Sequence, residues 1–294
     1  MSVDWLIPAL LTIVTAATPL VFAAVGEVVV EKAGVLNLGV EGMMIIGAIA
    51  AFATAVSTGS EVLAILAGAG AGVLIAIIFG VLTVYLQSNQ VATGLALTIF
   101  GLGLSALIGH SYVGKTFDGL AKMNIPGISD IPIIGPVLFG HDALVYLSVV
   151  SVAIVAWVLT RTRTGLLIRA VGENHDAAHS IGYSVTLVRM GAIMFGGAMA
   201  GIGGAYLSIA YTPLWAENMT AGRGWIALAL VVFASWKPWR AFFGAYLFGG
   251  ITIIQLYAQG MGVEVSSQFL SMLPYVATIL VLVIISRDSA RARL

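Results

Sequence analysis

Cysteine is missing from all 294 residues of the chain, and charged residues make up only 9% of it. Without cysteine there are no disulfide bonds, thiolate nucleophiles or thiolate metal ligands. A soluble globular domain carries about 25% charged residues. The shortage of charge, together with 60% hydrophobic residues, therefore indicates a membrane protein. The formal net charge is zero, which gives no electrostatic reason to expect a nucleic-acid partner.

Apolar runs of helical length recur along the whole chain. A membrane-spanning helix needs about 20 mostly apolar residues, and no segment alternates as a barrel strand does. We therefore predict an all-α polytopic membrane protein, with a single transmembrane domain over residues 1–294. The first run resembles a secretory signal but lacks its positive leader, so we expect a retained span. About nine spans are expected, at 5–25, 40–57, 62–86, 91–110, 142–160, 188–210, 224–236, 241–259 and 267–286.

The distribution of lysine and arginine predicts the orientation, because cytoplasmic loops carry an excess of both. If residues 161–188 are cytoplasmic, alternation through nine spans places the N-terminus outside and the C-terminus inside. Residues 111–141 then form the largest outer loop, which is rich in Gly and Pro and should be mostly irregular. Only Lys115, Lys122 and Arg223 fall outside. The inner side receives Lys32, Arg161, Arg163, Arg169, Arg189, Lys237, Arg240, Arg287, Arg291 and Arg293.

One long polar segment, "RTRTGLLIRAVGENHDAAHSIGYS", interrupts the apolar sequence at residues 161–184. Asn174 is a good N-cap and Gly182 a natural helix stop, so we expect a helix of about two turns between them. Three interpretations are open. His175 and His179, spaced i, i+4, could belong to a metal site. The segment could be a solvated loop, or it could be a short helix that docks on a cytoplasmic partner.

A second motif, "GHSYVGKT" at residues 109–116, matches the phosphate-binding pattern G-x-x-x-x-G-K-[ST]. That loop works only between a strand and a helix, where backbone N–H groups cradle phosphate. Here a membrane helix precedes the motif, and a stretch with two glycines and a proline follows it. We therefore expect no nucleotide site in this chain.

Glycine is abundant, with 35 residues, and it gathers in runs at residues 68–72 and 196–204. Small residues let membrane helices approach closely. We expect these runs to serve helix packing.

Within the polar segment, the pattern G-x-x-x-R-A-V-G-E-N-x-x-A-A-x-x-x-G resembles the cytoplasmic coupling loop of ABC-importer permeases in the ribose and branched-chain amino-acid permease superfamily. "EKAGVLNLGVEGMMIIGA" at residues 31–48 resembles the early segment of the nucleoside and simple-sugar branch, and residues 222–250 also agree. The resemblance covers essentially the whole chain. It assigns ATPase coupling to Arg169, Gly172, Glu173, Asn174, His175, Asp176, Ala177, Ala178 and Gly182.

The resemblance also implies partners. A permease of this kind binds no cofactor itself and is not an enzyme. It pairs with a second permease subunit, identical or different, in a bacterial plasma membrane. Two cytoplasmic subunits bind and hydrolyse ATP with Mg²⁺, and an outer binding protein delivers the substrate.

Transporters are often built from inverted repeats, in which helices interrupted by glycine mark the substrate path. The spans at 40–57 and 224–236 fit this pattern and point in opposite directions. Polar groups inside a membrane are functional candidates, although Asn37 could merely cap a helix and residues 89–90 could end a loop. Trp225 or Tyr211 could stack a base or sugar, or belong to an interfacial aromatic belt. The predicted path residues are Asn37, Glu41, Asn89, Gln90, Thr93, Arg223 and Trp225, with Glu217, Asn218 and Gln255 as further polar candidates.

Two other functions compete with the ATP-driven importer. A secondary transporter would need paired buried carboxylates or ion sites, and Glu41 is the only candidate carboxylate near a helix break. A membrane enzyme would need a cluster of acids, bases or metal ligands inside the spans. His110 and His141 fall at the ends of spans, so the sequence offers no such cluster.

Overall fold

The computed structural model of the chain describes residues 6–123 and 134–260, together with residues 269, 272, 273, 276, 279 and 280. Within these residues seven helices are long and apolar enough to cross a membrane. An eighth, α10 (Arg223–Phe233), is apolar but shorter. The predicted span at 267–286 lies almost wholly outside the described residues. The seven long helices are α1 (Leu6–Lys32), α2 (Val40–Thr58), α3 (Glu61–Gly80), α4 (Gln90–Gly109), α6 (Ala143–Arg161), α9 (Val185–Tyr206) and α11 (Pro238–Gly260).

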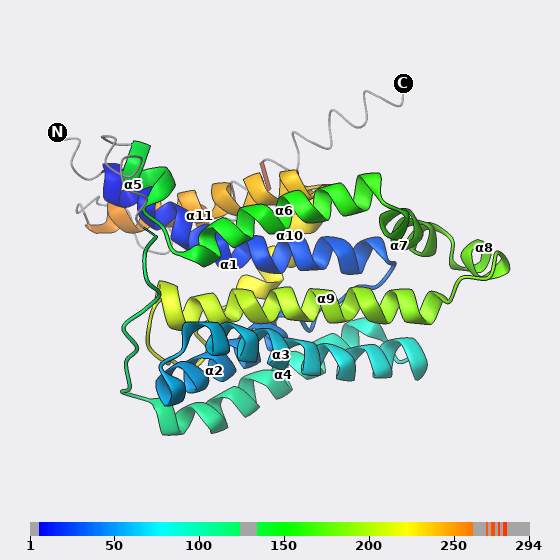
Figure 1. Ribbon diagram of the computed structural model, residues 1–294, viewed down its shortest axis with the longest axis horizontal. Helices are drawn as coiled ribbons and strands as arrows, with labels where there is room; N and C mark the ends of the chain where they lie inside the picture. The colour runs from blue at the N-terminus through cyan, green and yellow to red at the C-terminus, as the bar shows by residue number, and fades with distance from the viewer. Residues whose placement is uncertain are drawn as a thin grey trace.

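The central helix of the bundle is α1, which packs against α9, α11, α10 and α6 (Figure 1). At 27 residues it is about 40 Å long. It extends two turns beyond the predicted span, which ended at residue 25. Glu27 and Glu31 therefore lie within the helix rather than in a loop after it.

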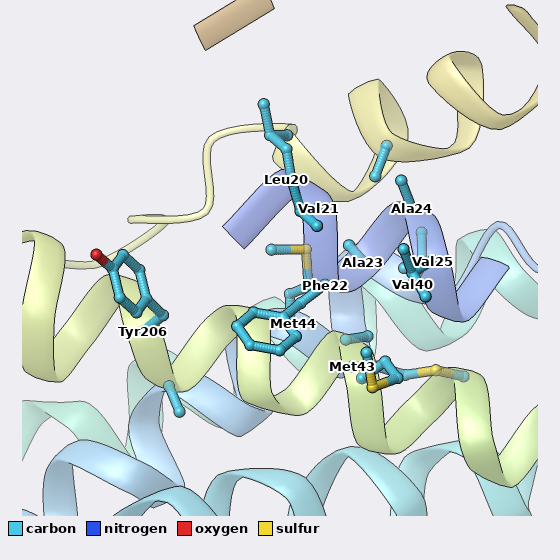
Figure 2. Close-up of a cluster of buried hydrophobic side chains, with 14 of the residues drawn as sticks. Leu20, Val21, Phe22, Ala23, Ala24, Val25, Val40, Met43, Met44 and Tyr206 are labelled. Carbon is cyan, nitrogen blue, oxygen red and sulfur yellow. The ribbon is translucent and has the colours of Figure 1, made fainter. Parts of the chain in front are cut away.

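The core lies where α1, α2 and α9 meet. Figure 2 shows residues 20–25 of α1, Met43 and Met44 of α2, and Tyr206 of α9 within this cluster. Because lipid is as apolar as these side chains, close packing rather than removal from water holds such helices together.

Glycines make the close packing of α3 on α9 possible. A Cβ added at Gly72 of α3 would lie 2.1 Å from the Gly197 carbonyl oxygen, and one at Gly201 of α9 would lie 2.2 Å from that of Gly68. On the other side of α9, a Cβ at Gly204 would lie 1.8 Å from the Met44 carbonyl oxygen. The predicted packing role of the two glycine runs is confirmed at these positions.

The two ends of the bundle differ. One end carries the short helices α7 (Arg163–Glu173) and α8 (His175–Ser180), at the right of Figure 1. The opposite end carries α5 (Ile134–Phe139), the only helix described within the predicted outer loop, and the 3-10 turn His110–Tyr112. Two π-helical turns, Val81–Tyr85 and Leu207–Tyr211, end α3 and α9.

Candidate functional site

Two interrupted helices meet inside the bundle. The chain breaks at residues 33–39 before α2 and at residues 212–222 before α10. Positive φ angles at Gly34 in the first break, and at Asn218, Ala221 and Gly222 in the second, make these turns. The first turns of α2 and α10 lie against each other, a contact that the sequence did not predict.

The Glu41 carboxylate joins the two breaks. Its Oε1 accepts hydrogen bonds from Thr220 Oγ1 at 2.5 Å and from the Gly222 N–H at 2.8 Å. Its Oε2 accepts one from the Gly224 N–H at 2.6 Å. A helix N-terminus presents unpaired N–H groups and the positive end of its dipole, so it is a favourable place for a carboxylate. Glu41 is only 2% exposed, and its three hydrogen bonds tie α2 to the start of α10.

Glycine is required at position 224 by this contact. A Cβ there would lie 2.6 Å from the Glu41 Cα and 2.7 Å from its backbone nitrogen. The glycine pattern "GRG" at residues 222–224 therefore serves a turn at its first position and a close helix contact at its third.

Asn37 organises the first break. Its Nδ2 donates to Glu27 Oε1 at 2.8 Å, and its Oδ1 accepts from the Gly39 N–H at 3.0 Å. Gly39, rather than Asn37, is the N-cap of α2 and makes no side-chain capping bond. Asn37 and Glu27 are both fully buried, so the pair fastens the break to α1.

Glu27 is a buried carboxylate that sequence reasoning missed. The predicted first span ended before it, and a glutamate after an apolar run is typical of a loop. Its position four residues before Glu31, in a run that stays apolar through Val30, was the available signal for a longer helix. One oxygen of each carboxylate, Glu27 Oε2 and Glu31 Oε1, is buried without a hydrogen-bond partner, while Glu31 Oε2 accepts from Trp236 Nε1.

Trp225 also reaches the first break. Its Nε1 donates to the Leu38 carbonyl oxygen at 3.3 Å, and the same oxygen accepts from Thr98 Oγ1 at 3.1 Å. The indole remains 44% exposed. A partly exposed aromatic ring therefore stands beside the junction of α2 and α10.

Arg223 makes no ion pair with Glu41. Its Nη1 donates to the carbonyl oxygens of Met219 and Thr220, at 3.0 and 3.3 Å. Its guanidinium carbon lies 5.7 Å from the centre of the Tyr211 ring, a cation–π arrangement. A cavity of about 190 Å³ lies beside this pair between α1, α10 and α11. Its polar lining comes from Tyr211, Arg223, Thr252 and Gln255.

The remaining predicted path residues lie around the start of α4. Asn89 caps this helix, accepting from the Ala92 N–H at 3.0 Å, and Gln90 Oε1 accepts from the Leu36 N–H at 2.8 Å. Thr93 hydrogen-bonds Ser88. Gln90 is thus close to the first break. Glu217 and Asn218 are exposed in the second break.

The polar segment folds into two helices. Thr162 caps α7 by accepting from the Gly165 N–H, and "RAVGE" forms the last turns of this helix. Asn174 caps α8 by accepting from the Ala177 N–H at 2.9 Å, and Gly182 follows the helix with φ +91°. The predicted cap, short helix and glycine stop are confirmed.

One of the predicted ATPase-coupling residues in α8, Ala178, is not exposed. Ala178 is 1% exposed and packs within the chain. His175, Asp176, Ala177 and His179 are exposed, as are Glu173 and, after the helix, Ile181 and Tyr183.

The polar segment touches the first break directly. A Cβ added at Gly172 of α7 would lie 2.1 Å from the Lys32 carbonyl oxygen and 3.1 Å from the Gly34 nitrogen. Just beyond the segment, Arg189 Nε donates to the Ala33 carbonyl oxygen at 3.2 Å. The segment therefore contacts the same turn that continues through Asn37 to Glu41.

The two histidines of α8 and the sequence "GHSYVGKT" lie at opposite ends of the bundle. His175 lies 3.4 Å from Asp176, and no group of three or more His, Asp or Glu residues suited to a metal occurs among the residues described. The sequence "GHSYVGKT" begins at Gly109, the last residue of α4, and no helix follows the motif as far as residue 123. Thr116 instead forms an isolated β-bridge with Leu214.

A multi-pass bundle with interrupted helices meeting inside it, and capped polar helices at one end, defines a membrane transport subunit. A family described as the permease component of branched-chain amino acid transport systems matches residues 9–285. The chain belongs to this permease family.

Curated relatives match nearly the full length. The chain is 39% identical to a putative glucose ABC transporter permease protein of Haloferax volcanii, over 95% of this chain and 92% of the relative. It is 35% identical to a nucleoside ABC transporter permease protein of Lactococcus lactis, over 90% and 88%. It is 31% identical to a guanosine ABC transporter permease protein of Bacillus subtilis, also over 90% and 88%.

Proposed function

We propose that this chain forms the translocation path of an ATP-driven importer for nucleosides or related simple sugars. The observation that carries the substrate class is that full-length relatives are named as permeases for glucose, nucleosides and guanosine. Sugars and nucleosides carry hydroxyl groups that need neutral donors and acceptors, which Asn, Gln and Thr supply. Stacking on an aromatic ring suits both a base and a sugar face.

The polar segment transmits the work of ATP hydrolysis. In this proposal a cytoplasmic ATPase, which holds ATP and Mg²⁺, docks on the exposed residues of α8 and its flanks. A short, capped helix can act as a rigid lever between the ATPase and the bundle. The tight contact of Gly172 with the turn at Lys32–Gly34 supports this route into the bundle.

The substrate path runs beside the junction of α2 and α10. Trp225, Tyr211, Arg223 and Gln90 supply its exposed or half-buried groups, and Asn37 and Glu41 hold its walls in place. Asn89 and Thr93 set the start of α4 next to it. A second permease subunit, identical or different, completes the channel, and an outer binding protein delivers the substrate.

We further propose nine spans with inverted symmetry, the N-terminus outside and the C-terminus in the cytoplasm of a bacterial plasma membrane. The meeting of the first turns of α2 and α10 inside the bundle supports the symmetry. Basic residues support the orientation, because Lys32, Arg169 and Lys237 lie at the α7–α8 end. Lys237 is placed there by its neighbour Trp236, whose indole donates to Glu31 of α1. At the α5 end, Lys122 forms a β-bridge with Asp142.

Single cysteines at Ser2, Asp118 and Ala290 test the orientation in this cysteine-free chain. Impermeant reagents should label the first two in intact cells and not the third.

Charge reversal at Glu173 tests the coupling role. Glu173 is exposed at the junction of α7 and α8, so Glu173→Arg should leave the permease inserted in the membrane while ATPase association and uptake fall together. Asp118→Asn, near the opposite end of the bundle, is the control. Normal ATPase copurification with Glu173→Arg and with a further Asp176→Arg variant would contradict docking at this surface.

A further inference from the structure

An apolar groove runs along the side of the bundle, away from the junction of α2 and α10. Its sides are α6 and α9, which both pack on α1, and α7 closes one end. Its volume is about 340 Å³, and Thr164 is its only polar lining residue. Other lining residues include Val29, Ile154, Val158, Leu167, Leu187 and Phe195.

Gly191 keeps this groove open. A Cβ added at Gly191 would meet no atom within 4 Å, whereas one at Gly196, Gly197, Gly201 or Gly204 of the same helix would lie 2.3 Å or less from a neighbour. Helix packing explains those four glycines but not Gly191. The absence of a side chain at Gly191 instead leaves space on the wall of the groove.

Basic residues stand at the closed end of the groove. Arg161 is exposed at the end of α6, two residues beyond the lining residue Leu159, and Arg163 is exposed beside Thr164. Among the residues described, no carboxylate lines the groove and neither arginine forms an ion pair. α7 buries Ile168 and Val171 yet leaves Leu166 60% exposed, as a helix lying at a membrane interface does.

We propose that this groove binds one acyl chain of an anionic phospholipid whose phosphate lies between Arg161 and Arg163. An apolar channel that continues into a basic rim matches the two parts of such a lipid, because basic pockets between membrane helices bind anionic head groups. An apolar helix of a second copy of this chain could fill the groove, but it would bring no negative charge to Arg161 and Arg163. The groove thus serves as a lipid site rather than as a helix-docking face. This inference depends on the membrane location alone and not on the substrate or the ATPase.

Native mass spectrometry of the purified chain with phosphatidylglycerol or phosphatidylcholine tests the proposal. Wild-type protein should prefer phosphatidylglycerol by about 30-fold, as expected for two arginines near an anionic group. The double variant Arg161→Gln/Arg163→Gln should lose that preference. Gly191→Phe should lose binding of both lipids, because the ring fills the groove.

Gly103→Phe is the matched control, since a Cβ added at Gly103 of α4 also meets no atom within 4 Å, while Gly103 does not line the groove. Gly191→Leu, a smaller change, guards against misfolding of the phenylalanine variant. Equal retention of the two lipids by wild-type protein would overturn the proposal. Unchanged lipid binding by both Gly191→Phe and Gly191→Leu would overturn it as well.

Discussion

The Glu41 carboxylate and the Gly224 backbone lie 2.6 Å apart, so that a side chain from the first turn of α2 completes the first turn of α10. The residues are separated by 183 positions in the sequence. The carboxylate accepts from the Gly222 and Gly224 N–H groups at the start of α10, which would otherwise be left unpaired inside the bundle. The junction is therefore both a structural connection and a place where the two halves of the chain can influence each other.

Replacing Glu41 should test this connection. Glu41→Gln keeps the shape but replaces one acceptor oxygen with an NH₂ group that faces N–H donors. The variant should fold, lose about 1–3 kcal/mol of stability and show altered uptake. Glu41→Leu should be worse, because it leaves Thr220, Gly222 and Gly224 without an acceptor. Thermal unfolding and uptake per inserted permease measure both effects. Wild-type values for both variants would show that the contact has no role.

Glycine packing can be tested within one helix. Gly72→Ala in α3 should destabilise the protein strongly, because its Cβ would lie 2.1 Å from the Gly197 carbonyl oxygen. Gly70→Ala, two residues earlier, meets no atom within 4 Å and should be neutral or stabilising by up to about 1 kcal/mol, the helix-propensity difference. The melting temperatures of the two variants give the comparison. Similar melting temperatures would contradict the packing account of α3 and α9.

Gly172 should separate ATPase binding from transport. Alanine at this position would place a Cβ 2.1 Å from the Lys32 carbonyl oxygen, so α7 must move away from the turn before α2. The exposed residues of α8 are unchanged. We expect Gly172→Ala to copurify with its ATPase but to take up substrate about tenfold more slowly or worse, a loss equivalent to about 1.4 kcal/mol in the coupled step. Gly103→Ala is the control, and normal uptake by Gly172→Ala would exclude this contact from the coupling route.

His141 should make stability depend on pH. Burial lowers its pKa below the ordinary value of 6.5, outweighing the bond to the Val137 carbonyl oxygen and the charge of Asp142, while Lys122 lowers the pKa further. Below pH 6.5 the unfolded chain therefore takes up a proton at His141 that the folded chain resists. Stability should fall as the pH drops from about 6.5. His141→Gln should flatten this part of the curve, whereas substitution of the exposed His110 should not, and an unchanged acid slope in His141→Gln would assign the loss to another group.

The part of the site that could be predicted from the sequence is local. The cap at Asn174 and the stop at Gly182 depend on residues within one or two turns, and the structure has both. Eight of the nine predicted spans correspond to helices, because apolar length is a property of contiguous sequence. The ninth, at 267–286, lies almost wholly outside the described residues and stays a prediction.

The partners of the buried polar groups could not be predicted in the same way. The acceptor role of Glu41 depends on backbone N–H groups about 180 residues away, and a carboxylate alone gives no sign of them. The sequence predicted Glu41 as a path residue, and the structure adds that both of its carboxylate oxygens accept hydrogen bonds within the fold. The predicted first span ended at residue 25 and left Glu27 outside it, whereas in the structure Glu27 lies inside α1 and accepts a hydrogen bond from Asn37.

Uptake into proteoliposomes tests the central claim most directly. Vesicles would contain the permease with its ATPase, ATP trapped on the ATPase side, and the outer binding protein with labelled nucleoside or sugar on the other side. The account predicts uptake that requires ATP and the ATPase, that persists when ion gradients are collapsed, and that is lost with Glu173→Arg. Uptake driven by a proton or sodium gradient in vesicles that lack the ATPase would contradict it.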